Sequence, residues 1–368
     1  MDGNTQSILV TGGAGFIGSI LCRHLVEDRG RRVVIVDKLT YAASLAALGT
    51  IRERSGVRFE QCDIADRERI ARLLREEKVG GVIHLAAETH VDRSIHSPGE
   101  FIATNVVGTF HLLETVRGYW SDLDEHAKAA FRFHLVSTDE VFGDADDESE
   151  GRVAETRYRP SSPYSATKAA SDHLATAWQR TYGLPVVITN STNTYGPWQH
   201  PDKLVPLMIT NAIRQRPLPL YGTGTQLRDW LHVTDHVHGL ALAFERGLPS
   251  RSYHFGGGQA RTNLQIVEAI CGLLDERRPR PAGKRHEELI AFVPDRPGHD
   301  RRYHLDAAPT RTELGWSPAV GLERGLIDTV DWYLENEVWW RALGELDPPA
   351  CAQVAEDGIE SSPERRQA

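Results

Sequence analysis

The stretch that decides the fold is Ser7-Ile8-Leu9-Val10-Thr11-Gly12-Gly13-Ala14-Gly15-Phe16-Ile17-Gly18. A short apolar run leads into a Gly-x-x-Gly-x-x-Gly turn, and Phe16 to Val26 then carries apolar residues at helical spacing. Glycines let the backbone turn sharply and let phosphate oxygens approach its amides, while the helix N-terminus adds unpaired N–H groups and partial positive charge. The same glycines could form a tight turn only, but the strand before them and the helix after them favour a dinucleotide site.

The alternation of strand and helix continues through the first half of the chain. We expect buried strands at 7–10, 32–37, 58–61, 82–85, 133–137 and 186–189, with helices between them, for example at 16–26, 70–77 and 105–119. Because each crossover helix must cover a sheet face, this pattern predicts an α/β fold with a Rossmann-like, doubly wound parallel sheet.

After about residue 190 the pattern changes. Prolines and glycines indicate a loop-rich region up to about 224, followed by short strands at 230–233 and 253–256, helices at 264–274 and 328–336, and an exposed charged loop at 276–286. We therefore expect a smaller, mixed α/β C-terminal substrate domain. The predicted division is 1–190 for the dinucleotide-binding domain, with 232–256 returning to it, 191–231 and 257–343 for the substrate domain, and 344–368 for a mobile tail.

Composition excludes several classes of protein. The chain has 368 residues and a formal net charge of −9, which argues against a nucleic-acid partner. No apolar run approaches the roughly 18 residues of a membrane span, and the N-terminus lacks the basic region of a signal peptide. Four widely spaced cysteines form no CxxC pair, so we expect free thiols in the cytoplasm, and no metal site.

Asp37 ends the second expected strand, where it should accept hydrogen bonds from the adenosine ribose hydroxyls. A 2′-phosphate at this place would meet a like charge, so NAD is favoured over NADP. Lys38 next to it weakens that preference slightly. Asp63, after the third strand, could meet the adenine edge or could equally cap the following helix.

Tyr164 and Lys168 stand four residues apart just after Pro163, where a helix should begin. This spacing puts both side chains on one helical face. A free tyrosine titrates near ~10, and a neighbouring ammonium together with a cationic nicotinamide ring should lower that value. Tyr164 could then take a proton from a sugar hydroxyl while hydride leaves the same carbon. A half-buried Tyr beside an exposed Lys is the structural alternative.

Thr138, Asp139 and Glu140 end the strand at 133–137, and ligands of an open parallel sheet bind beyond the carboxyl ends of its strands. Adjacent carboxylates repel, so one tends to keep its proton while the other stays ionised. An acid and a base side by side suit the elimination of water. A solvated pair of acids at a strand end is the alternative.

These residues occur among further recognisable motifs over roughly residues 7 to 340. They are Thr11 to Gly18, Asp37 to Ala42, His84 to Asp92, Ser137 to Gly143, Tyr164 to Lys168, Asn193 to Pro197, Arg228-Asp229-Trp230 and Asp295 to Asp300. With them the chain resembles the extended short-chain dehydrogenase/reductase superfamily, and within it the nucleotide-sugar 4,6-dehydratases that act on dTDP-glucose or a related nucleotide-diphosphate hexose. Epimerases and decarboxylases of the superfamily share the glycine turn and the Tyr/Lys pair but usually lack the acid pair.

The resemblance implies a mechanism. Tyr164, with Lys168 beside it, would deprotonate the C4 hydroxyl as hydride moves to NAD, and Thr138 would hold that hydroxyl. Glu140 would then remove the C5 proton, and protonated Asp139 would release the C6 hydroxyl as water. The hydride returns to C6, so a tightly bound NAD is regenerated in each cycle. The resemblance also implies a homodimer formed through helices that include the one bearing Tyr164.

The resemblance implies ligand-binding residues as well. Around the cofactor we expect Gly12, Gly15, Phe16, Ile17, Gly18, Asp37, Lys38, Thr40, Asp63, Ile64, Ala86, Ala87, Thr104, Tyr164, Lys168 and Thr194. Around the substrate we expect Thr89, His90, Thr138, Asn193, Lys203, Leu204, Arg228, Asn263, Arg296 and His299. Thr194 stands where asparagine is common in the family.

Two other functions compete with this interpretation. One is a nucleotide-sugar 4-epimerase or UDP-glucuronate decarboxylase of the same superfamily, which would tolerate Glu140→Gln because no C5 proton leaves. The other is a catalytically silent, NAD-sensing protein on the same fold, which the four intact reactive side chains disfavour.

Overall fold

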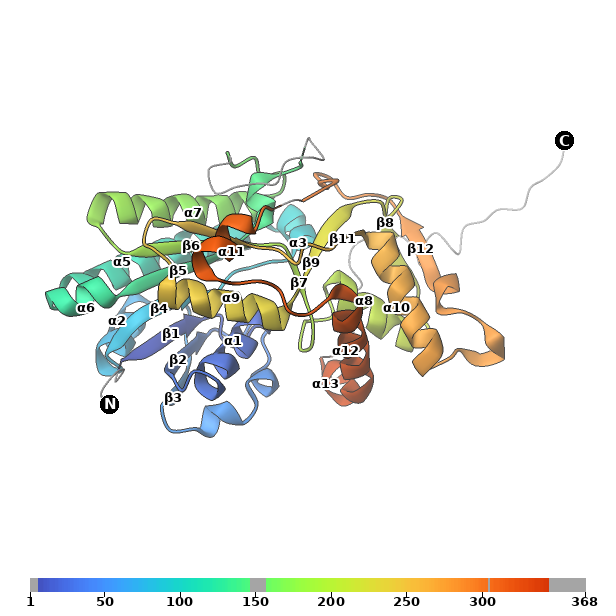
Figure 1. The fold of residues 1–368 in the computed structure, drawn as a ribbon, viewed down its shortest axis with the longest axis horizontal. Coiled ribbons are helices and arrows are strands. Elements are labelled where there is room, and N and C mark those ends of the chain that lie inside the picture. Colours follow the sequence, from blue (N-terminus) through green and yellow to red (C-terminus); the bar gives the residue numbers. More distant parts are fainter. Residues whose placement is uncertain (1–5, 146–156, 304, 344–368) are drawn as a thin grey trace.

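The computed structural model describes residues 6–145, 157–303 and 305–343. Its centre is a seven-stranded sheet in which every pairing is parallel, with the strand order β10-β6-β5-β4-β1-β2-β3 (Figure 1). The strands are β1 Ser7–Thr11, β2 Arg32–Asp37, β3 Val57–Gln61, β4 Val79–His84, β5 Arg132–Thr138, β6 Val186–Ser191 and β10 Ser252–Phe255. The order changes direction between β1 and β4, and this is where a doubly wound sheet binds its ligand.

Helices cover both faces of this sheet. One face carries α1 Phe16–Glu27, α9 Val233–Arg246 and α11 Ala308–Leu314, and the other carries α2 Arg67–Glu76, α5 Thr109–Ser121 and α7 Pro163–Tyr182. Because side chains alternate along a strand, Ile8 and Val10 of β1 enter the core under α1 and α9, whereas Leu9 enters the core under the other helices. The Rossmann-like, doubly wound sheet is confirmed.

A second core lies beyond the end of the sheet, on the right of Figure 1. It is formed by α8 Leu204–Ile213, α10 Asn263–Arg277, α12 Leu322–Glu335, α13 Glu337–Ala342 and the parallel pair β8 Leu218–Tyr221 and β12 Ile290–Val293. A three-stranded sheet of β11 Ala260–Thr262, β9 Leu227–His232 and β7 Asn193–Tyr195 adjoins it. These additional mixed sheets match the mixed character expected for this part of the chain.

The remaining elements are short. They are α3 Val91–His96, α4 Pro98–Phe101, α6 Glu125–Ala130, a π-helical segment η2 Ile102–Gly108, and the 3₁₀ segments η1 Leu45–Glu53, η3 Asp139–Phe142, η4 Pro281–Gly283 and η5 His286–Leu289. The helix expected at 105–119 therefore begins as a π-helix and becomes α-helical only at Thr109. The tail at 344–368 lies outside the described residues.

The loop-rich expectation for the region after 190 is wrong at 204–213, which is helix α8. Pro206 is the third helical residue, and an N–H in the first turn has no partner within the helix, so a proline there costs no hydrogen bond. Five other residues of the helix are buried and apolar, namely Val205, Met208, Ile209, Ala212 and Ile213, and they pack in the second core. Within the described ranges, no helix has the length and apolarity that crossing a bilayer requires.

Candidate active site

The glycine turn between β1 and α1 has no room for side chains. Gly12 has a φ of +68°, and a Cβ on it would lie 2.7 Å from the backbone nitrogen of Ala86. A Cβ on Gly18 would lie 2.1 Å from the carbonyl oxygen of Gly12. Gly15 precedes α1, and no side chain caps the helix there. The first N–H groups of α1 are thus left open to a ligand, and this cradle fits the diphosphate of NAD.

Asp37 at the end of β2 holds the glycine turn in place. Its Oδ2 accepts a hydrogen bond from the backbone N–H of Ala14 at 2.9 Å, and its Oδ1 accepts one from Leu39 at 2.8 Å. Burial is the main cause that raises the pKa of Asp37, and these two bonds act against it. A carboxylate oxygen can accept more than one bond, so Asp37 can still receive a ribose hydroxyl.

Lys38 and Asp63 lie next to Asp37 on the same wall. The Lys38 Nζ donates to the Thr104 hydroxyl at 3.2 Å and lies 3.7 Å from Asp63 Oδ2. Asp63 Oδ1 accepts from the backbone N–H of Ala65 at 2.9 Å. The following helix α2 is instead capped by Asp66, which accepts from the Arg69 N–H at 3.0 Å. Asp63 therefore closes a local turn and lines the cleft, and it is not the helix cap.

The reactive acids follow directly from β5. The strand ends at Thr138, and the 3₁₀ segment η3 begins with Asp139 and Glu140, so the two side chains leave the backbone in different directions. The Thr138 hydroxyl donates to Asp139 Oδ1 at 3.2 Å and accepts from the Glu140 backbone N–H at 3.3 Å. Thr138 thus fixes both acids at the carboxyl edge of the sheet.

The surroundings of these two carboxyl groups differ. Burial raises the pKa of Asp139 well above its ordinary value, and the charge of Glu140 raises it further. Burial also raises the pKa of Glu140, but Arg296, Arg228 and Lys203 act against it. The pair therefore favours a protonated Asp139 and an ionised Glu140, which is the division between acid and base that elimination requires.

Tyr164 and Lys168 lie in the first turns of α7, whose start is fixed by a capping box between Ser162 and Ser165. Both side chains are buried, and Lys168 Nζ donates to the carbonyl oxygen of Val136 at 2.9 Å. The expected lowering of the tyrosine pKa is not found in the chain alone. Burial raises the pKa of Tyr164 well above its ordinary value, and the charges of Glu140 and Asp139 raise it further, whereas a hydrogen bond with Thr138 acts in the opposite direction.

The cationic side chains converge on the acids from the second core. Arg228 on β9 is 4% exposed, donates to the carbonyl oxygen of Asp300 at 2.8 Å and stacks 4.1 Å from the ring centre of Tyr303. Arg296 pairs with Asp92 at 3.4 Å. A carbonyl oxygen accepts a hydrogen bond from Arg228, and a carboxylate pairs with Arg296. Both guanidinium groups are therefore oriented before a ligand binds.

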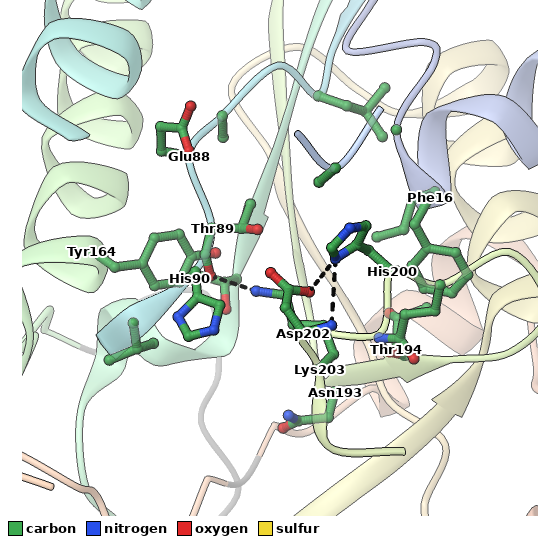
Figure 2. Close-up of a pocket in the computed structure, with 18 of the residues that line it drawn as sticks. Phe16, Glu88, Thr89, His90, Tyr164, Asn193, Thr194, His200, Asp202 and Lys203 are labelled. Carbon is green, nitrogen blue, oxygen red and sulfur yellow. Dashed lines mark hydrogen bonds and ion pairs between the residues drawn. The ribbon is translucent and has the colours of Figure 1, made fainter. Parts of the chain in front are cut away.

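Figure 2 shows the middle of the cleft, where Thr89, His90, Tyr164, Asn193 and Lys203 surround one space. The Lys203 Nζ donates to the carbonyl oxygen of Thr89 at 3.0 Å. The His90 ring accepts a bond from the Arg93 backbone N–H at 3.4 Å and caps α3. Burial lowers the pKa of His90 to about 4, so its imidazole is neutral near pH 7.

The side chain of Thr194 makes a hydrogen bond to a histidine of α9. Its Oγ1 lies 2.9 Å from Nδ1 of the buried His236. Burial lowers the pKa of His236 to about 3, so this partner stays neutral. Thr194 stands where asparagine is common in the family. Its hydroxyl is therefore held by the neutral ring of His236.

Every residue expected at the site from sequence lines one cleft of about 470 Å³. The cleft also includes residues that the sequence did not single out, among them Glu88, Asp92, Gln199, His200, Asp202, Tyr221 and Trp230. Asp92 could have been noticed, since it ends the motif at 84–92. Glu88 lies in the same motif, and Trp230 lies in the motif at 228–230. Gln199, His200 and Asp202 come from the proline-rich loop before α8 and Tyr221 from β8, where no sequence pattern indicated a site.

Comparison with known proteins gives a consistent result. A family model described as GDP-mannose 4,6 dehydratase matches residues 9–329. The dTDP-glucose 4,6-dehydratase of Neisseria meningitidis serogroup B is 52% identical over 338 residues, which are 91% of this chain and 95% of the relative.

Among solved structures, a dTDP-glucose 4,6-dehydratase from Streptomyces venezuelae with NAD bound is 41% identical and superposes with a TM-score of 0.84, covering 92% of this chain and 100% of the other. A UDP-glucose 4-epimerase from Thermotoga maritima is 28% identical with a TM-score of 0.78, covering 90% of this chain and 100% of the other. Dehydratases and epimerases therefore share the fold, but the sequence is much nearer to the dehydratases.

Proposed function

This chain belongs to the family of nucleotide-sugar 4,6-dehydratases, and we propose that it converts dTDP-glucose, or a closely related nucleotide-diphosphate hexose, into the 4-keto-6-deoxy sugar and water. The observation that carries the proposal is the pair of buried Asp139 and half-buried Glu140 beside Tyr164, at the edge of a sheet whose glycine turn fits NAD. When bound, NAD takes a hydride from one sugar carbon and returns it to another, so the net reaction is the loss of water.

Three residues serve the oxidation step. Tyr164 takes the proton of the C4 hydroxyl, and Thr138, which hydrogen-bonds Tyr164, positions that hydroxyl. Lys168 is fixed by the carbonyl oxygen of Val136 one helical turn from Tyr164. Because the chain alone raises the pKa of Tyr164, formation of the phenolate depends on positive charge that arrives with the ligands.

The acid pair serves the elimination step. The 4-keto group acidifies the C5 proton, which Glu140 removes, and the electron pair released at C5 forms the C5–C6 double bond. Asp139 gives its proton to the departing C6 hydroxyl, which leaves as water. The raised pKa of Asp139 keeps this proton available, and the cations facing Glu140 favour its ionised form.

The remaining residues bind and orient. Gly12, Gly15 and Gly18 hold the dinucleotide diphosphate, and Asp37 holds the adenosine ribose. Lys203, Arg228 and Arg296 hold the nucleotide diphosphate of the sugar, for which a forked guanidinium and a point charge are suited. Asn193, Asn263, His299, Thr89 and His90 complete the substrate wall. A cofactor that is regenerated in each cycle should remain tightly bound.

The test is a product assay with a label. Purified protein with dTDP-glucose should give a product lighter by one water, and deuterium placed at C4 should reappear at C6 of the same molecule. UDP-, GDP- and CDP-glucose assayed in parallel identify the preferred base. Inactivity with all four sugars in the presence of NAD would refute the proposal, and product epimerised at C4 without loss of water would revive the epimerase alternative.

We also propose that the protein is a homodimer formed through α5 and α7. Ile102, Val107, Phe110 and Tyr182 leave large apolar side chains exposed on η2, α5 and α7, by 51%, 43%, 36% and 47% respectively. Covering such a face stabilises an association. Sedimentation of the wild type and of Phe110→Lys should distinguish a dimer from a monomer.

The division of the chain and its location are part of the same proposal. The strand pairing of β10 with β6 supports the assignment of 232–256 to the NAD-binding part, with 191–231 and 257–343 forming the sugar-nucleotide part. Cys22, Cys62 and Cys271 are free and buried, which agrees with a cytoplasmic location.

A further inference from the structure

One polar contact joins the two sides of the cleft at its outer rim. We propose that Tyr41 is a positioning residue that retains the cofactor, because its hydrogen bond to Asp202 latches residues 38–44, here called the strap, across the mouth of the cleft. The inference rests on the proposed function only in taking NAD as the cofactor.

Both ends of the strap are fixed to the body of the protein. Leu39 at its start has a φ of +60°, which is uncommon for a residue with a side chain, and its N–H donates to Asp37 at 2.8 Å. At the other end, the Ser44 N–H donates to the carbonyl oxygen of Ala14 in the glycine turn at 2.8 Å, and the Trp339 indole donates to the Ser44 hydroxyl at 3.0 Å. The strap can therefore move only in its middle.

The middle of the strap is held by Tyr41. Its hydroxyl donates to Asp202 Oδ2 at 3.0 Å, although 161 residues separate the two along the chain. The guanidinium of Arg93 stacks 4.1 Å from the centre of the Tyr41 ring. Asp202 is held in turn by His200, whose Nδ1 lies 3.2 Å from Asp202 Oδ1. Figure 2 shows His200 and Asp202 facing each other across the space between Phe16 and Lys203.

The position of this contact separates it from the chemistry. Thr40, Ala42 and Ala43 of the strap line the cleft, as do His200 and Asp202 on the opposite side, whereas Tyr41 does not. Tyr41 is 39% exposed. Burial of the hydroxyl is the main cause that raises the pKa of Tyr41, so the hydroxyl stays a donor over the whole working pH range. Breaking the contact would free one wall of the cofactor site without touching a reacting group.

The experiment measures cofactor exchange in the absence of sugar. The protein is loaded with NAD, freed of excess by desalting and chased with isotopically labelled NAD, and the bound fraction is followed by mass spectrometry. A hydrogen bond to a charged group that breaks before release should slow release by roughly tenfold, so Tyr41→Phe should release NAD about 5- to 20-fold faster. Asp202→Ala, which leaves no acceptor for the Tyr41 hydroxyl, should accelerate release similarly, and the double variant should be no faster than Asp202→Ala alone.

Tyr253→Phe is the matched control, because it also removes one tyrosine hydroxyl with a hydrogen bond, accepted from the Leu248 N–H at 3.0 Å, and Tyr253 does not line the cleft. It should exchange NAD at the wild-type rate, and thermal unfolding should show that all variants fold. If Tyr41→Phe does not fold, Asp202→Ala alone carries the test. Wild-type exchange in the latch variants, or equal acceleration in the control, would overturn the proposal. A latch-dependent exchange in a protein that forms no keto sugar would overturn the proposed function instead.

Discussion

Replacing Glu140 with glutamine separates the oxidation of the sugar from the loss of water. Glutamine has nearly the same shape, so Thr138 can still receive the backbone N–H of residue 140. It cannot accept the C5 proton, however. A positioned general base contributes about 10²- to 10⁴-fold to its step, so we expect formation of the 4-keto-6-deoxy product to slow by about that factor.

The structure also predicts what this variant does to the first step. The charge of Glu140 is the second cause, after burial, that raises the pKa of both Tyr164 and Asp139. Removing it lowers both values. More Tyr164 is then phenolate at a given pH, so the pH at which C4 oxidation reaches half its maximal rate should move downward. Asp139 should lose its proton more readily, so residual elimination should weaken as the pH rises.

Single-turnover mixing tests both parts. Oxidation is followed by the absorbance of the reduced nicotinamide, elimination by mass spectrometry of the quenched sugar, and exchange at C5 by uptake of deuterium from heavy water. The variant should accumulate reduced nicotinamide and a 4-keto hexose that retains its C6 oxygen, with little exchange at C5. If elimination in Glu140→Gln proceeds within about threefold of the wild type, a loss far smaller than the one expected for a base, then Glu140 is not the base. An upward shift of the oxidation profile would refute the electrostatic argument.

Three further predictions concern stability and the cofactor. Asp139→Asn should stabilise the fold at neutral pH. A carboxyl group whose folded pKa is raised stabilises the protein below its unfolded pKa, and that contribution is lost as the pH rises. Thermal scans should show no difference between the variant and the wild type near about pH 4, and near neutrality the variant should melt at least about 2 °C higher than the wild type. Gly18→Ala should abolish NAD binding and cost about 1–3 kcal/mol of stability, since its Cβ would lie 2.1 Å from the Gly12 carbonyl oxygen. NAD titration and urea unfolding measure both, and Gly272→Ala in helix α10, where nothing lies within 4 Å, is the control for space. Asp37→Asn removes the charge that should repel a 2′-phosphate, so the preference for NAD over NADP should fall by roughly tenfold in binding titrations, and an unchanged preference would contradict the role given to Asp37.

The sheet and most of the site could be predicted from the sequence because both follow from local patterns. Apolar runs separated by helical periods can form little other than a doubly wound parallel sheet, and the carboxyl ends of parallel strands meet at one edge. Residues placed after β1, β2, β4 and β5 were therefore bound to converge. Thr138, Asp139 and Glu140 needed no tertiary information to be placed at that edge.

The parts that could not be read from the sequence depend on contacts between distant segments. His200 and Asp202 belong to a proline-rich loop without periodicity, and only folding brings Asp202 to Tyr41. The pKa of Tyr164 was judged from Lys168, its neighbour on the helix, yet burial and the acids of β5 determine it in the folded chain. Sequence spacing reports which charges are near along one element, but it does not report the desolvation or the charges that other elements supply.

The geometry of the site explains how one scaffold can serve both epimerases and dehydratases. The glycine turn, Tyr164 and Lys168 suffice to exchange a hydride with C4, and that step requires no second acid–base pair. Dehydration needs two carboxyl groups in opposite protonation states within reach of adjacent carbons. Here the 3₁₀ turn after β5 provides them at no cost to the sheet, because Asp139 is buried with Thr138 while Glu140 faces Arg228, Arg296 and Lys203 from the second core. In the proposed mechanism, the cations that hold the substrate diphosphate also keep the base ionised, which couples the affinity for the sugar nucleotide to the protonation state of Glu140. Neutralising Arg296 should therefore both weaken binding and raise the pKa of the base, and a variant that shows the first effect without the second would separate the two roles.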